Sequence, residues 1–393
     1  MSYCKSSQRS QAIQPFYVMQ ILARAKELEA QGHDVIHLEV GEPDFATADT
    51  IIQAGHAALE QQLTHYTPAL GIPELRQAIA SYYQKQFGVA LDWQRVVVTP
   101  GASGALMLAL SLLTDAGDRV LLSDPGYPCN RHFARLLNIE TDNVPTDAAS
   151  GFQLTPELLA QNWHDNTRAV MLASPSNPIG SVIDRSDMQA LCDFVQNRHS
   201  HVIVDEIYQG LVYDSDNITA LQCWDDAIVI NSFSKFFGMT GWRLGWMVVP
   251  QDCVEYVDAM AQNIFLAPPT LSQHAALAAF TDEATAEFER RRQIFQQRRD
   301  YLLPALQRLG FDVPVTPQGA FYIYAGCRRF TDDSFRFVND LLEQAHVAVT
   351  PGRDFGDNRA TEYVRFAYTR PVEVLDQAVL RIEGFLKSQA DCL

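Results

Sequence analysis

Short apolar segments alternate with helical patterns between about residues 50 and 280, and this alternation limits the possible folds more than any other feature of the chain. The apolar segments are rich in Val, Ile and Leu and lack a polar face, which is typical of strands buried on both sides. Such strands, separated by helices, indicate an α/β fold with a mainly parallel sheet covered by helices. The expected strands lie within residues 95–100, 119–125, 168–175, 201–206, 227–234 and 244–249, and the clearest helices between them within residues 104–113, 129–138 and 185–198.

The pattern changes after about residue 282. A long, charged helical pattern covers residues 282–310 and ends at Gly310, so we interpret it as a connector to a second, smaller domain. Two alternating strands, residues 319–326 and 362–369, indicate a sheet in that domain, and the helical pattern of residues 16–32 is expected to join it. We expect residues 1–45 to form an N-terminal segment of the small domain, residues 46–283 the large domain, and residues 284–393 the interdomain helix and the small C-terminal domain.

The composition favours a protein that acts on small molecules. The chain has 393 residues and a formal net charge of -17, whereas nucleic acids and anionic membranes attract basic surfaces. Its seven cysteines are scattered without metal-site spacing, so we expect reduced thiols in a cytoplasmic protein and no metal site. The first residues show no apolar signal segment. Residues 96–114 are uncharged, but a Gly-rich turn divides them, which indicates a buried strand, turn and helix rather than a membrane span.

One lysine stands apart from the others. Lys235 lies in "INSFSKFFGMTGWRLGW", residues 230–246, where the next charged residue is Arg243. Either its stem packs on the neighbouring phenylalanines while the ammonium reaches water, or its apolar setting lowers the pKa and lets the amine form a Schiff base. The stretch by itself leaves both interpretations open. The remaining lysines lie in polar or amphipathic contexts, at Lys5, Lys26, Lys85 and Lys387.

Polar groups follow several of the expected strands, at the edge of the sheet where ligands bind in this class of fold. The turn "TPGASGA", residues 99–105, offers backbone amides and the Ser103 hydroxyl to an anion such as a phosphate, although it is also an ordinary strand-to-helix turn. Asp205 ends an apolar strand, where it either caps the next turn or partners a buried cation, and Tyr208 follows three residues later.

Three further residues complete this group. Asn177 lies in the turn "SNPIG", Tyr127 follows "SDPG" and could stack on a planar ring, and Arg243 suits either a phosphate or a structural ion pair. Together the residues supply an amine for an imine, an acid for a ring nitrogen, a ring to stack, donors for a phenolic oxygen and a phosphate site. Those are the requirements of pyridoxal 5'-phosphate.

The motifs "GEPD", "HYTPALGIPELRQAIA", "SNPIG", "DEIY", "SFSKFFGMTGWRLGW" and "YVRFAYT" occur in this order over nearly the whole chain. The set resembles the fold-type I aminotransferases of the aspartate aminotransferase (class I/II) family. This resemblance implies a large domain with a mainly parallel seven-stranded sheet sandwiched by helices, and a small α+β domain built from both termini. It also implies a homodimer whose active sites are shared between the subunits.

The resemblance further implies roles for individual residues. Lys235 is expected to hold the cofactor as a Schiff base and then to move the proton between the substrate Cα and C4' of the cofactor. Asp205 would pair with the protonated ring nitrogen, Asn177 and Tyr208 would bond the ring 3'-oxygen, and Tyr127 would stack on the ring. The phosphate would be held by Ala102, Ser103, Ser232, Ser234 and Arg243, with Tyr66 reaching in from the other subunit.

The substrate α-carboxylate is expected to bind Arg365, helped by Gly41 and Asn177. The strand pattern agrees, because Val364 and Phe366 face the side opposite to Arg365; without the other motifs, Arg365 would be interpreted as a surface strand residue. We expect a pyridoxal-phosphate-dependent aminotransferase that uses amino acids and 2-oxo acids in a ping-pong reaction. The alternatives are a C–S β-lyase on the same fold and a non-enzymatic ligand-binding module.

Two positions depart from the family pattern. Ile179 replaces the usual threonine of the "SNPIG" turn, and Ser103 stands where some bacterial aspartate aminotransferases resemble "GGKQA", with a lysine that favours dicarboxylates. The sequence therefore gives no support for aspartate as the donor. The motifs do not identify the side-chain pocket, for which residues 13–19, "IQPFYVM", are a candidate part of the wall.

Overall fold

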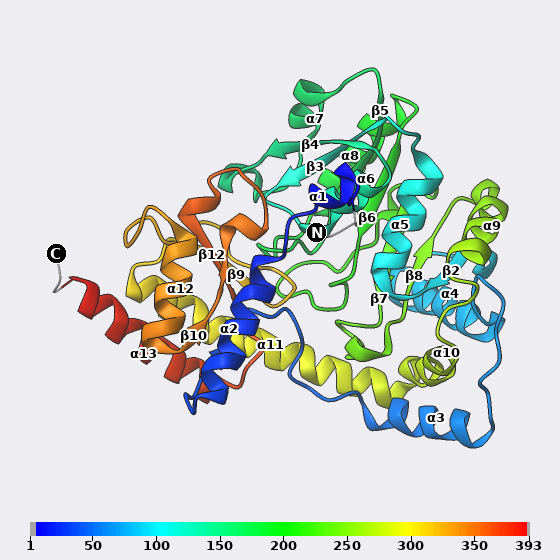
Figure 1. The fold of residues 1–393 in the computed structure, drawn as a ribbon. Coiled ribbons are helices and arrows are strands. Elements are labelled where there is room, and N and C mark those ends of the chain that lie inside the picture. Colours follow the sequence, from blue (N-terminus) through cyan, green and yellow to red (C-terminus); the bar gives the residue numbers. More distant parts are fainter. Residues whose placement is uncertain (1–4, 391–393) are drawn as a thin grey trace.

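A twisted seven-stranded sheet forms the centre of the larger part of the molecule (Figure 1). The computed structural model describes residues 5–390. Six of the strands run in one direction, and β8 is antiparallel to both of its neighbours. The mainly parallel sheet predicted from the apolar segments is thus confirmed. In spatial order the strands are β2 (Val96–Thr99), β8 (Gly245–Val248), β7 (Ile228–Ser232), β6 (His201–Asp205), β5 (Thr167–Ala173), β3 (Arg119–Asp124) and β4 (Glu140–Pro145).

Alternate residues of these strands enter two different apolar cores, one on each face of the sheet. In β6, Val202 and Val204 belong to one core, whereas Ile203 belongs to the other. Because both faces are buried, an apolar residue is favourable at every position, and this is why the strand segments show no polar alternation. The helices around the sheet are α3 (Asp49–Glu60), α4 (Pro73–Phe87), α5 (Gly101–Leu113), α6 (Cys129–Leu136), α7 (Pro156–Asn162), α8 (Arg185–Gln196), α9 (Val254–Ile264) and α10 (Thr270–Ala276).

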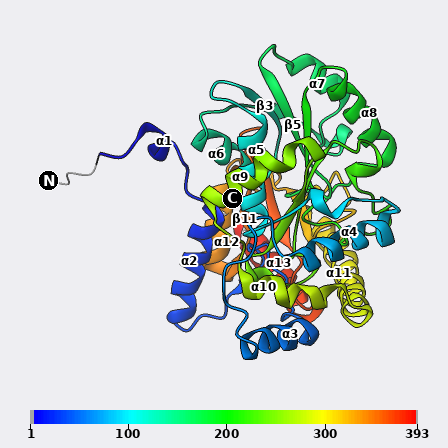
Figure 2. The same ribbon diagram turned by 90° about the vertical axis from the view of Figure 1, so that its right-hand side faces the viewer.

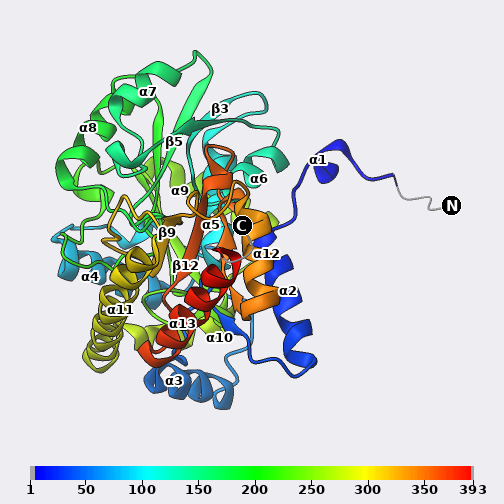
Figure 3. The same cartoon turned by 90° about the vertical axis from the view of Figure 1, so that its left-hand side faces the viewer.

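A second group of elements packs beside the large sheet and combines segments from both ends of the chain (Figures 1 and 3). Its antiparallel sheet has the order β11 (Thr350–Pro351), β12 (Tyr363–Ala367) and β9 (Tyr322–Gly326). The short strands β1 (Ile36–His37) and β10 (Val347–Ala348) pair in parallel, which joins the N-terminal segment to this group. The accompanying helices are α2 (Tyr17–Ala30), α12 (Ser334–Ala345) and α13 (Val372–Ala390).

The predicted connector is the single long helix α11 (Asp282–Leu309). Thr281 caps its first turn, and Gly310 ends it with a φ of 101°, a left-handed conformation that favours glycine. The N-terminal segment carries the short helix α1 (Gln8–Gln11), which contacts the end of α6, where Arg9 Nη1 donates a hydrogen bond to the backbone oxygen of Leu136 over 3.0 Å (Figure 2).

Strand β4, which reads "ETDNVP", is absent from the strands predicted from the sequence. This strand lies at the edge of the large sheet and is only partly buried, so its residues lack the apolar signature of the inner strands. The uncharged residues 96–114 form β2 and α5, as predicted. No helix within residues 5–390 combines the length and the apolar character needed to cross a membrane.

Candidate active site

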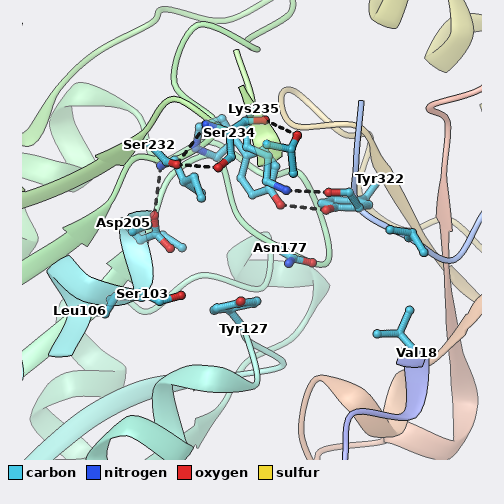
Figure 4. A pocket seen from close by; sticks show the side chains of 18 of the residues that line it. Val18, Ser103, Leu106, Tyr127, Asn177, Asp205, Ser232, Ser234, Lys235 and Tyr322 are labelled. Atoms are coloured by element: carbon cyan, nitrogen blue, oxygen red, sulfur yellow. Dashed lines mark hydrogen bonds between the residues drawn. The ribbon is translucent and has the colours of Figure 1, made fainter. Parts of the chain in front are cut away.

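A cavity of about 230 Å³ lies at the carboxyl ends of the parallel strands, where the large sheet faces the small sheet and α2 (Figure 4). Every site residue predicted from the sequence lines it, except Tyr66. These lining residues are Gly41, Ala102, Ser103, Tyr127, Asn177, Asp205, Tyr208, Ser232, Ser234, Lys235, Arg243 and Arg365.

Lys235 follows β7 and directs its amine into the cavity. Its Nζ donates a hydrogen bond to the backbone oxygen of Gly41, 2.6 Å away, and lies 5.8 Å from the ring centres of Tyr208 and Phe321. Burial lowers the pKa of this amine to about 8, and the positive charge of Arg365 acts in the same direction. The amine is thus hydrogen-bonded to the backbone within the cavity, which favours the Schiff-base interpretation. An amine with this pKa has an appreciable neutral, nucleophilic fraction near neutral pH.

Asp205 lies at the end of β6, next to β7. One of its carboxylate oxygens accepts a hydrogen bond from the backbone nitrogen of Ile207, 3.0 Å away, so the side chain does cap the following turn while it also lines the cavity. Burial raises the pKa of Asp205 to about 6, whereas the amine of Lys235 opposes the shift. A buried carboxylate of this kind is stabilised by a cationic partner inside the cavity.

Hydroxyl and amide donors converge at another end of the cavity. Ser232 Oγ and Ser234 Oγ are 3.0 Å apart, and the backbone nitrogen of Ser234 donates to Ser232 Oγ over 3.1 Å. The first turn of α5, which contains Ser103, opens onto the same region. The guanidinium of Arg243 lies close to the start of α5. A Cβ added to Gly101, the first residue of this helix, would be 2.9 Å from Arg243 Nη2. Helix amides, hydroxyls and a guanidinium together form a site for a phosphate.

Arg365 on β12 is buried, contrary to its interpretation as a surface residue. Its Nη1 donates to Asn177 Oδ1 over 2.9 Å, and its Nη2 donates to the backbone oxygen of Glu39 over 2.6 Å. The Nη2 also donates to Thr350 Oγ1 over 3.2 Å. Its Nε is buried and has no hydrogen-bond partner within residues 5–390. A fixed, buried guanidinium with a free donor is suited to a carboxylate ligand.

The sequence analysis did not single out Tyr322 on β9. Its hydroxyl is 2.8 Å from the hydroxyl of Tyr208, and its ring centre is 4.2 Å from the guanidinium carbon of Arg365. A Cβ on Gly41 would lie 1.9 Å from the Tyr322 hydroxyl, so only glycine allows this approach. Tyr322 and Arg365 lie on the same face of the small sheet, and this shared face could have pointed to Tyr322. The pairing that sets the face joins strands distant in sequence, so it was not available from the sequence.

The start of α2 contributes Phe16, Val18 and Met19 to the cavity wall. They lie within residues 13–19, which the sequence analysis named as a candidate for the wall, and Figure 4 shows Val18 across the cavity from the sheet edge. Tyr66 instead has an exposed fraction of 82% in the segment between α3 and α4. Over the described part of the chain, no group of three or more His, Cys, Asp and Glu side chains is arranged to hold a metal ion.

The donor set fits pyridoxal 5'-phosphate on structural grounds. An amine of lowered pKa, a buried acid, an aromatic ring and a phosphate site surround one cavity, and a buried guanidinium remains for the substrate. The fold and the site therefore define a fold-type I pyridoxal-phosphate enzyme.

Comparison with known proteins identifies the family within this class. The family model described as aminotransferase class I and II matches residues 33–382. The chain is 40% identical over 379 residues to the valine–pyruvate aminotransferase of Mycobacterium tuberculosis, covering 96% of this chain and 97% of that protein. It is 34% identical over 386 residues to the aspartate/prephenate aminotransferase of Thermus thermophilus, covering 97% of this chain and 98% of that protein.

A solved structure of an aminotransferase from Mycobacterium tuberculosis superposes with a TM-score of 0.95 at 39% identity, covering 98% of this chain and all of that one. The chain belongs to the class I and II aminotransferases and is a pyridoxal-phosphate-dependent transaminase. The predicted fold, cofactor and enzyme class are thus confirmed, and the family and its relatives favour transamination over the alternative β-lyase.

Proposed function

We propose that this aminotransferase takes the amino group from α-amino acids with uncharged, apolar side chains and passes it to a 2-oxo acid of the same kind, such as pyruvate. The observation that carries the proposal is the charge distribution of the cavity. Of the described residues that line it, the cationic ones are Lys235, Arg243 and Arg365. Each already has a task in the proposed site, as the reactive amine, the phosphate ligand and the α-carboxylate ligand.

No lining cation is therefore left, among the described residues, for a second substrate carboxylate. The wall at the start of α2 is apolar at Phe16, Val18 and Met19, and Ser103 is uncharged. Burying an unpaired carboxylate against such a wall is costly, whereas burying methyl groups there is favourable. The similarity to a valine–pyruvate aminotransferase supports the same substrate class.

We further propose the following roles. When bound, pyridoxal phosphate supplies an aldehyde and an electron-withdrawing ring. The amine of Lys235 would hold the cofactor and, once the substrate amine has displaced it, would move a proton at the substrate Cα, for which a pKa near 8 is well matched. The carboxylate of Asp205 keeps the ring nitrogen protonated, since charge pairing in a buried site stabilises both ions. Ser232, Ser234, Ala102, Ser103 and Arg243 bind the phosphate, and Tyr127 stacks on the ring.

Arg365 is proposed to bind the α-carboxylate through its free Nε and one of its terminal nitrogens. Asn177 and Glu39 fix the guanidinium before substrate arrives, so little conformational entropy is lost on binding. Tyr322 and Arg365 from the small sheet and Val18 from α2 all line the cavity, and the water that they displace from around the guanidinium strengthens the ion pair.

The assembly and location are part of the same proposal. The family resemblance and the exposed Tyr66 support a homodimer in which Tyr66 contacts the phosphate in the partner's site. The proposed domains are residues 46–283 for the large one and the segments 1–45 and 284–393 for the small one, in a cytoplasmic enzyme.

A donor and acceptor screen tests the substrate class. The purified holoenzyme is mixed separately with valine, leucine, alanine, aspartate and glutamate, and the loss of its visible absorption band gives kcat/KM for each donor. We expect valine and leucine to exceed aspartate by at least about tenfold, the low end of the value of one buried methylene group. Faster reaction with aspartate would contradict the proposed class. In a separate mixture with cysteine, which has a leaving group on Cβ, release of sulfide, ammonia and pyruvate without a new amino acid would instead indicate the β-lyase.

A further inference from the structure

The first turn of α2 obtains its cap from a distant part of the chain. The N-cap residue is Phe16, whose phenyl ring cannot accept a hydrogen bond. The backbone nitrogens of Tyr17 and Val18 instead donate to the two carboxylate oxygens of Asp354, over 2.8 and 2.9 Å. A helix begins with unpaired amides and a partial positive charge, so a carboxylate placed there holds the helix end in position.

This helix end is also the apolar wall of the cavity. Phe16, Val18 and Met19 line the cavity, and the ring of Phe16 meets the ring of Tyr127 edge to face at 6.4 Å between centres. The amides that Asp354 binds belong to Tyr17 and Val18, within the wall itself. A displacement of this turn therefore changes the space available to a substrate side chain.

Asp354 has a fixed position and lies four residues after Thr350, which contacts the proposed α-carboxylate ligand Arg365. It is buried, and it ends a short helical turn, Gly352–Asp354, that follows β11 directly. On β11, Thr350 is paired in register with Arg365 and accepts a hydrogen bond from it. The backbone oxygen of Asp354 accepts a hydrogen bond from Arg131 Nη2 over 3.1 Å. One short segment thus connects the carboxylate anchor to the wall.

We propose that Asp354 is a positioning residue that determines side-chain specificity, because its carboxylate fixes the wall of α2 at a set distance from Arg365. Asp354 itself touches neither substrate nor cofactor in this account. The inference rests on the proposed function, since it concerns how that site selects among amino acids. Large apolar donors use the contacts with the wall, whereas alanine has too short a side chain to use them.

The test compares the variants Asp354→Ala and Asp354→Asn with a matched control, Asp184→Ala. Asp184 caps α8 by accepting a hydrogen bond from the backbone nitrogen of Asp187 over 2.8 Å, and it does not line the cavity. For each holoenzyme, the half-reaction with valine, leucine and alanine gives kcat/KM. Hydrogen exchange of the backbone amides of Tyr17 and Val18 is measured on the same preparations.

For Asp354→Ala, we expect the ratio of kcat/KM for leucine over alanine to fall by about tenfold, the size of a lost apolar contact of one or two methyl groups. The amides of Tyr17 and Val18 should exchange at least about tenfold faster. Asp354→Asn retains one acceptor oxygen and should show a smaller change in both quantities, and it carries the test if the alanine variant does not fold. The control should leave the donor ratio and this exchange unchanged.

An unchanged donor ratio in a folded Asp354→Ala or Asp354→Asn enzyme would overturn the inference, as would an equal loss of activity with all three donors. In that case the wild-type activity still stands, and only the role of Asp354 is refuted. A wild-type holoenzyme that transfers no amino group from any donor would refute the proposed function, and this inference with it.

Discussion

The cofactor end of the cavity and its carboxylate end are built from different kinds of contact. At the cofactor end, Asp205 and Ser232 stand at the ends of two adjacent parallel strands, and Lys235 follows three residues after Ser232. At the carboxylate end, Arg365 is held by Asn177, Glu39 and Thr350, which come from three widely separated segments. The first arrangement follows from local strand–helix units, whereas the second exists only after the chain ends have packed together. Substitutions should therefore affect cofactor binding and substrate-carboxylate binding separately.

The largest effect is expected from Lys235→Ala, which removes the reactive amine and leaves the carboxylate end intact. Transamination should fall by roughly 10⁴-fold, the upper range for losing a group that moves protons. The visible band of the bound cofactor should disappear, while a substrate carboxylate still binds through Arg365. Absorption spectra and the half-reaction measure this. The control is Lys85→Ala, an exposed lysine paired with Asp282, which should behave as wild type.

A substitution at the other end, Arg365→Lys, should produce the opposite pattern. A lysine ammonium cannot bond Asn177 and Glu39 and at the same time make two parallel hydrogen bonds to the substrate α-carboxylate. We therefore expect kcat/KM to fall by about 10²–10³-fold for amino donors and 2-oxo acid acceptors alike. The cofactor band should remain, and most of the loss should be in KM. Arg353→Lys, at an exposed ion pair with Asp333, serves as the control. Loss of cofactor from Arg365→Lys would show that the two ends are not separable.

The pH dependence of cofactor capture should be determined mainly by the burial of Lys235, at the cofactor end. Burial lowers the pKa of Lys235 from 10.5 to about 8, so below this pH the neutral amine decreases about tenfold for each pH unit. The rate at which the apoenzyme captures pyridoxal phosphate should rise with pH and level off above about pH 8. Stopped-flow absorbance across pH 6 to about 10 measures it. A rate that continues to rise past pH 9 would mean that the amine is not desolvated.

The smallest effect is expected where the two ends meet, at the contact between Tyr322 and Tyr208. Tyr322→Phe removes one hydroxyl of the pair but keeps the ring beneath Arg365, so kcat/KM should fall by about threefold to tenfold, the value of one hydrogen bond. Tyr324→Phe is the matched control, since it removes a hydroxyl from the same strand and face without touching Tyr208. Equal effects of the two variants would contradict a specific role for the Tyr322 contact.

Most of the cofactor end could be predicted from the sequence. The apolar strands indicated the sheet, the polar residues at their ends indicated its ligand-binding edge, and the family resemblance supplied the role of each. β4 was missed because a polar edge strand has no apolar signature. Tyr322 was missed because nothing in its own segment reveals that the hydroxyl of Tyr208 and the bare backbone of Gly41 lie against it.

The sequence by itself determined the sheet and the class of cofactor, and it indicated Lys235 as the candidate amine, because strand burial and strand-end chemistry are encoded within short segments. The tertiary structure decided the free donor of Arg365, the apolar wall of α2 and the cap that Asp354 places on it. Tyr17 and Asp354 are separated by 337 residues, and a contact over such a separation depends on the packing of the whole chain. Local patterns carry no information on that packing, so the substrate end became visible only in the folded molecule.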